Sequence, residues 1–340
     1  MMFNLVVFIA GLVIAAVTLR DVFETVIVPG GNRGSLRVAH RLAHVLLPIW
    51  KSVRGKRRGL SGTFAPIVLV VSFVLWISLL SAGFGLMIYA ARSDFQPPPH
   101  SIPEAIYQAG CAIVTLGLNE MRANGLGRWI VLGAGFCGLA VMTMAVTYLL
   151  AVQSSLATRD IGVIKLNTAA GDPPSALALL EHYAEIDDRQ ELAEMLREGR
   201  NWCATIHQSH LAHPSLLYFQ STGTGAGWPA SLGALIDLAL IAEYCLDDQQ
   251  LRGPAVLLEA ESTRLADHIY ETIGITAKPS ECSQADVEQV IERLTKAGYD
   301  IRRDVDVGVL AERRDTLQSA VEGIAVYLGK PSAPLVPRRA

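Results

Sequence analysis

Residues 101–119 read SIPEAIYQAGCAIVTLGLN, and they predict a helix too short to cross a membrane. Ser101 is a favoured N-cap residue, Pro103 suits a first helical turn, and Glu104 stands where it completes a capping box. The apolar run from Ile102 to Val114 would be roughly 20 Å long at 1.5 Å per residue. Because the hydrocarbon core of a bilayer is about 30 Å thick, this helix would end inside it.

A longer apolar segment lies on each side of the short helix, at residues 65–91 and 129–152, and each is long enough to span a bilayer. The residues that follow the short helix, TLGLN at 115–119, therefore lie at membrane depth. Non-helical backbone is tolerated there only where protein buries it or where it lines a water-filled path. The stretch is thus either a pore loop or a re-entrant turn of an unrelated membrane protein.

The half-helix, the Thr-Leu-Gly that ends it and the two flanking spans together resemble the pore loop of the tetrameric potassium-channel superfamily. The filter of that family reads Thr-Val-Gly-Tyr-Gly-Asp, and here Asn119 replaces the second glycine and Leu118 replaces the aromatic residue. Asn tolerates unusual dihedral angles better than any residue except Gly. The resemblance implies that filter residues coordinate a permeating K⁺, or alternatively Na⁺, through backbone carbonyls and the threonine hydroxyl. These residues are Thr115, Leu116, Gly117, Leu118 and Asn119. It places Glu120 at the outer mouth.

The third span carries the next features of the resemblance. Gly138 stands where the inner helix of the family has its gating-hinge glycine, although close helix packing in lipid would also favour glycine there. Four apolar residues at spacings of three or four share one helix face: Leu139, Met142, Val146 and Leu150. By resemblance this face lines the inner cavity. A lipid-facing or helix-packing stripe would show the same pattern.

The composition divides the chain into a basic membrane half and an acidic soluble half. The chain is 51% hydrophobic and 18% charged, against about 25% charged in soluble domains. Residues 1–152 hold 12 Lys and Arg against 5 Asp and Glu, whereas residues 153–340 hold 17 against 27. We predict four segments: a first transmembrane helix at 1–32, a basic cytoplasmic loop at 33–62, a pore module at 63–152, and a cytoplasmic helical domain at 153–340.

The charges also predict the topology of a multi-pass protein of a bacterial cell membrane. The apolar N-terminal run has no Lys or Arg before Arg20, so it is not typical of a signal peptide. The stretch 33–59 holds eight Lys and Arg and no acid, which places it inside and the N-terminus outside. Within it, a basic amphipathic helix is expected to bind anionic lipid of the inner leaflet, or alternatively to move with a gate. Residues 21–26, DVFETV, resemble a motif of bacterial membrane proteins classed with ion channels.

The second half is predicted to be an all-α bundle. Helices are expected over 173–199, over 201–220 with a break near Pro214, and over 229–246, 253–273, 283–297 and 310–328. The 229–246 helix is interpreted as bundle core because Asp237 and Glu243 interrupt its apolar run. His207, His210 and His213 fan around a helix, so no shared metal site is expected, and scattered cysteines are typical of reduced thiols.

The predicted fold is an all-α membrane protein with three transmembrane helices, a re-entrant pore helix and filter loop, and a soluble C-terminal bundle. A single subunit cannot close a ring of carbonyls around an ion, so a homotetramer is expected. The leading functional interpretation is a cation channel, by resemblance potassium-conducting. The alternative is a non-conducting receptor or scaffold whose bundle binds an unknown ligand or protein. An enzyme is not expected because no nucleophile–base pair stands out, nor is a nucleic-acid partner or a cofactor.

Overall fold

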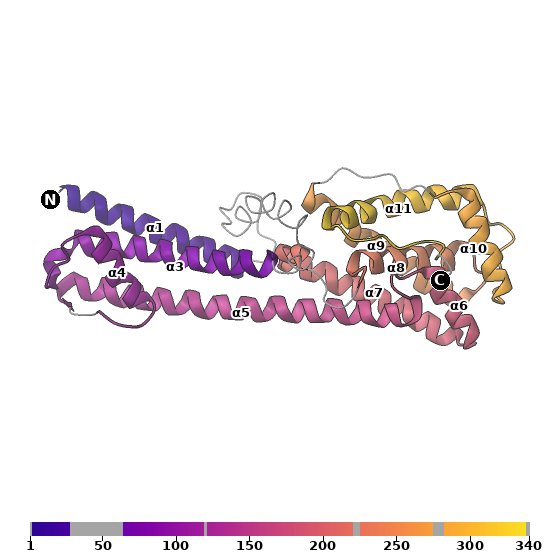
Figure 1. Ribbon diagram of the computed structural model, residues 1–340, viewed down its shortest axis with the longest axis horizontal. Coiled ribbons are helices and arrows are strands. Elements are labelled where there is room, and N and C mark those ends of the chain that lie inside the picture. Colours follow the sequence, from indigo (N-terminus) through magenta and orange to yellow (C-terminus); the bar gives the residue numbers. More distant parts are fainter. Residues whose placement is uncertain (1, 28–63, 119–120, 220–224, 275–281, 338–340) are drawn as a thin grey trace. The chain divides into compact units, whose positions relative to one another are not determined.

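The computed structural model describes residues 2–27, 64–118, 121–219, 225–274 and 282–337 (Figure 1). The chain divides into two compact units, Met1–Gln153 and Ser154–Ala340. The basic loop predicted at 33–62 lies outside the described residues, and so do Asn119 and Glu120.

The protein is an all-α membrane protein with a soluble helical part, as predicted. Among the described residues, three helices are long and apolar enough to cross a membrane: α1 (Met2–Val26), α3 (Phe64–Ala90) and α5 (Gly125–Ala170). In the described part of the chain, the named strands are β1 (Phe95–Gln96) and β2 (Arg122–Ala123), which form one antiparallel pair.

The first two spans cross at a pair of glycines. A Cβ added to Gly11 would lie 2.4 Å from the carbonyl oxygen of Gly83, and one added to Gly83 would lie 2.9 Å from the carbonyl oxygen of Gly11. Lipid offers no hydrophobic drive for helix association, so close backbone approach of this kind supplies the packing energy.

The third helix is longer than the span predicted at 129–152. Helix α5 starts at Gly125 and runs to Ala170. It starts early because Asp94 Oδ2 accepts hydrogen bonds from the amides of Leu126 (3.0 Å) and Gly127 (3.3 Å), which satisfies donors that a first turn leaves unpaired. It ends before Gly171, whose φ of 82° favours glycine.

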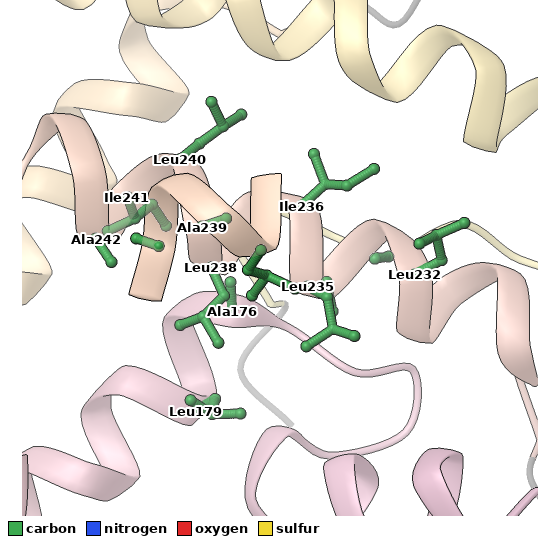
Figure 2. Packing of buried hydrophobic residues seen from close by; sticks show 14 of the residues in the cluster. Ala176, Leu179, Leu232, Leu235, Ile236, Leu238, Ala239, Leu240, Ile241 and Ala242 are labelled. Atoms are coloured by element: carbon green, nitrogen blue, oxygen red, sulfur yellow. The ribbon is translucent and has the colours of Figure 1, made fainter. Parts of the chain in front are cut away.

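The second unit is a helical bundle built around one buried helix. Its elements are α6 (Ala176–Glu185), α7 (Arg189–Ala212), the 3₁₀ helix η3 (Pro214–Tyr218), α8 (Trp228–Tyr244), α9 (Gln249–Ile273), α10 (Gln284–Lys296) and α11 (Val307–Leu328). All residues of α8 from Trp228 to Ala242 are buried. In Figure 2, Leu235 and Leu238 point toward Ala176 of α6, while Ile236 and Leu240 point to the other side.

The charge inside the buried helix is fully paired. Asp237, 1% exposed, accepts hydrogen bonds from Arg314 of α11 through both carboxylate oxygens (2.8 and 3.0 Å). Gln318 donates to Asp237 and to the carbonyl of Gly233, each at 2.8 Å. A buried carboxylate is tolerated only with such partners, so Asp237 fits the helix as a core residue.

The helix boundary predicted near Gly199 is wrong. The chain breaks instead between α6 and α7, where Asp187 has φ 50° and the side chain of Asp188 caps α7 by accepting from the amide of Glu191 (2.9 Å). Gly199 lies inside α7, where an added Cβ would come within 2.8 Å of Leu235 Cδ2. This glycine therefore permits close packing on α8 and does not end the helix.

Candidate pore site

The short helix α4 (Ile102–Ile113) starts as the sequence predicts. Ser101 is its N-cap and accepts a hydrogen bond from the amide of Glu104 (3.4 Å). The carboxylate of Glu104 accepts in return from the amide of His100 (2.7 Å), one residue before the usual capping-box partner. The helix packs closely on α3, since a Cβ on Gly85 would lie 2.6 Å from Ile106 Cα.

The end of α4 is a Schellman motif with an unusual residue in it. The amide of Thr115 donates to the carbonyl of Ala112 (3.1 Å), and the amide of Leu116 donates to the carbonyl of Cys111 (2.9 Å). This motif needs a left-handed residue directly after the C-cap, and that residue is usually Gly. Here it is Thr115, at φ 63°. A β-branched residue in this conformation is strained, and such strain concentrates at functional sites.

Along the four described residues of the predicted filter, the sign of φ alternates. Among them φ is positive at Thr115 (63°) and Gly117 (83°), and it is not positive at Leu116 or Leu118. A cation filter needs carbonyl oxygens that face a common axis. Thr115, Leu116 and Gly117 are exposed in the single chain, and Leu118 is half-buried against the core of the first unit.

Gly138 lies where the third span meets the end of α4. A Cβ added there would lie 2.1 Å from the carbonyl oxygen of Ile113, the last residue of α4. Gly135, one turn earlier, is less constrained, because its added Cβ would lie 3.4 Å from the carbonyl oxygen of Ala112. Gly138 therefore permits close packing of α5 on α4, and the hinge role assigned to it stays a prediction.

The predicted pore-lining face is largely uncovered. Leu139, Val146 and Leu150 are 57%, 59% and 64% exposed, and Met142 is half-buried. The described part of the chain leaves this face exposed. Both a cavity lining and a lipid-facing surface would be exposed in this way.

The segment after the filter returns to the loop that precedes α4. Strand β1 pairs with β2, with Phe95 opposite Ala123 and Gln96 opposite Arg122. The amide of Asn124 also donates to the carbonyl of Asp94 (2.7 Å). These bonds hold both ends of the loop that carries the filter.

A buried carboxylate in the first span was missed as a site residue by the sequence reasoning. Asp21 is 3% exposed, and its Oδ2 accepts a hydrogen bond from Nε1 of Trp76 (2.7 Å), which is 1% exposed. An ionisable residue within a membrane span is costly and is by default a candidate functional residue, so its position alone could have marked it. The bond ties α1 to α3. Nearby, Arg20 and Glu24 form an i,i+4 ion pair.

In the second unit the histidines have separate environments. His207 Nδ1 lies 3.3 Å from Glu261 Oε1, and its ring centroid is 5.1 Å from that of His268. His210 is buried against Trp228, and burial lowers the pKa of His210 to about 4. Among the described residues, no group of three or more His, Cys, Asp or Glu side chains is placed to bind a metal.

A cleft of about 270 Å³ lies between the C-terminal part of α5 and helix α7 in the second unit. Gly162 and Trp202 meet at its wall, where the Trp202 indole donates to the carbonyl of Arg159 (3.0 Å). Lys165 and Glu198, paired at 3.0 Å, stand at the exposed rim. This volume is slightly below that of typical small-molecule sites, which is about 300–1,000 Å³.

Comparison with known proteins supports membrane localisation. Over 295 residues the chain is 24% identical to a protein of Bacillus subtilis described as uncharacterized membrane protein YdjJ, covering 81% of this chain and 82% of that protein. No family model matches the chain, and no solved structure matches it. The similarity and the three apolar helices together support a membrane protein.

Proposed function

We propose that this chain is one subunit of a homotetrameric cation channel of the cell membrane, conducting potassium by resemblance. The observation that carries the proposal is the end of α4. A helix of 12 residues stops between two spans, and an exposed segment with positive φ at Thr115 and Gly117 follows it. Four copies around an axis would supply the rings of carbonyls that replace an ion's hydration shell.

The electrostatics of α4 favour a cation. The C-terminal end of a helix carries a partial negative charge, and α4 ends directly before the proposed filter. Gating is proposed to involve Gly138 and the helix that continues from it into the second unit, α5. The proposed orientation, with the N-terminus outside and the second unit in the cytoplasm, rests on the eight Lys and Arg of residues 33–59.

The test is potassium flux into proteoliposomes, with Gly117→Ala as the matched variant. A Cβ at Gly117 would meet nothing within 4 Å in the single chain, so the substitution acts chiefly through the backbone, whose φ of 83° an alanine rarely adopts. We expect flux from the natural protein and loss of selective flux from the variant. Equal, equally selective flux from both would contradict the filter assignment.

The second candidate function is a non-conducting receptor or scaffold that keeps the pore fold. The cleft between α5 and α7 supports it, because a chain that senses a small ligand needs such a site. Leu118 supports it as well, since the family has an aromatic residue at this filter position. A receptor of this kind would show no cation flux under any gradient, even from well-formed oligomers.

A further inference from the structure

The part of α5 that belongs to the second unit has one covered and one uncovered side. Val163, Leu166 and Ala170 are buried in the core of the unit. On the opposite side Ile161 is 57% exposed and Ile164 is 55% exposed. Both side chains are large and apolar, and isoleucine is among the residues most often buried.

These isoleucines belong to a seam with the spacing of a coiled coil. The exposed residues on this side follow at intervals of three and four, as the a and d positions of a heptad do: Ser154, Ala157, Ile161, Ile164 and Thr168. An ideal helix places all of them within an arc of about 80°.

The charges that flank the seam fit a second copy of the same helix. With Ser154 at position a, Asp160 falls at g and Lys165 at e of the next heptad. In a parallel coiled coil, g pairs with e five residues further on in the neighbouring helix. Within one chain these side chains pair with Arg159 and Glu198, and the Lys165–Glu198 pair is largely exposed, at 59% and 45%. Lys165 can therefore exchange partners at little cost.

We propose that residues 154–168 of α5 form a parallel coiled coil with the same residues of other copies of this chain. Its core is the seam, and Asp160 of one copy pairs with Lys165 of the next. Isoleucine at d, as at Ile164, disfavours two strands and favours a higher number. The number four rests on the proposed channel, whereas the seam and its flanking charges stand without it.

The test is cysteine crosslinking of the full-length protein in native membrane vesicles. Ile164→Cys and Ile161→Cys should each give mostly disulfide-linked dimers on mild oxidation, because core positions of neighbouring strands face each other. Val309→Cys is the control, since Val309 is equally exposed (57%) on α11 of the same unit. The unsubstituted protein with its five native cysteines sets the background. Dimer yields no higher than from Val309→Cys would overturn the proposal.

The charge pairing is tested in the Ile164→Cys background. Asp160→Lys should lower the dimer yield by placing like charges together, and adding Lys165→Asp should restore it. A double variant that crosslinks no better than Asp160→Lys alone would overturn the parallel register. Flux measured in the same vesicles separates the two proposals. Crosslinking without flux would support the coiled coil and contradict the channel. Flux without crosslinking would support the channel and contradict the coiled coil.

Discussion

At the scale of single residues, Thr115 stands in a conformation that suits glycine better. Its φ of 63° at the left-handed position of a Schellman motif costs about 1–3 kcal/mol for a non-glycine residue. Thr115→Gly should therefore raise the thermal stability of the oligomer, by about 1 kcal/mol, while removing the hydroxyl proposed to bind the ion. Thermal unfolding in detergent measures the first effect and potassium flux the second. A destabilised variant would show that Thr115 is not strained.

Gly138 lies in close contact with the end of α4. Gly138→Ala places a Cβ 2.1 Å from the Ile113 carbonyl oxygen, so α5 must move away from α4, at about 1–3 kcal/mol or more. Gly135→Ala is the matched control on the same helix, because its Cβ would meet Ala112 at 3.4 Å. We expect the first variant to lower the unfolding temperature and abolish flux, and the second to change little. Similar effects of both variants would refute the packing role.

The buried bond between Asp21 and Trp76 links the first span to the pore module. Trp76→Phe removes the donor and leaves a buried carboxylate short of one hydrogen bond, which costs about 1–3 kcal/mol. Asp21→Asn keeps an acceptor and should cost less than Trp76→Phe. Chemical unfolding of the full-length protein in detergent compares the two. If Trp76→Phe lowers the free energy of unfolding no more than Asp21→Asn does, this hydrogen bond does not stabilise the contact between α1 and α3.

At the scale of elements, helix α7 carries a histidine that makes the bundle sensitive to acid. Burial lowers the pKa of His210 to about 4, below its ordinary value of 6.5. Arg159, His207 and His268 face it and act in the same direction. The unfolded state binds the proton first, so stability falls as the pH drops from 6.5 toward 4, by on the order of 3 kcal/mol.

Denaturant unfolding as a function of pH, followed by the fluorescence of Trp228 beside His210, measures this dependence. In His210→Leu the free energy of unfolding should depend less steeply on pH, with a slope smaller by the equivalent of up to one bound proton. A remaining slope is expected, because burial also lowers the pKa values of His213 and His268. An unchanged slope in His210→Leu would assign the acid sensitivity to other groups.

The sequence predicted those elements whose signals are local. The α4 cap at Ser101 and the apolar runs of the spans act within a few residues. The errors arose where a distant residue decides the outcome. Asp94 starts α5 from 32 residues away, and Leu235 of α8 explains the glycine inside α7 that was taken for a helix end.

The candidate site divides in the same way. Thr115, Gly117 and Gly138 were found from a motif and its spacing, whereas the left-handed φ of Thr115 and the contact between Gly138 and Ile113 depend on how α4 ends and how α5 packs on it. Asp21 was visible as a charge in an apolar run, but its partner lies 55 residues away. No local pattern links those two positions.

At the scale of the whole molecule, each unit of the single chain has an uncovered apolar face on α5. Leu139, Val146 and Leu150 form it in the first unit, and Ile161 and Ile164 form it in the second. Additional copies of the chain would cover the apolar surface that each face presents. A homotetramer is the assembly that would complete both the filter and this surface.

The measurement that tests the central claim most directly is the reversal potential of the purified full-length protein in planar bilayers, with potassium on one side and sodium on the other. The account predicts a current that reverses many tens of millivolts from zero in favour of potassium, and loss of this selectivity in Gly117→Ala. A real current that reverses near zero would contradict a potassium-selective filter. No current from well-formed tetramers would contradict the channel itself.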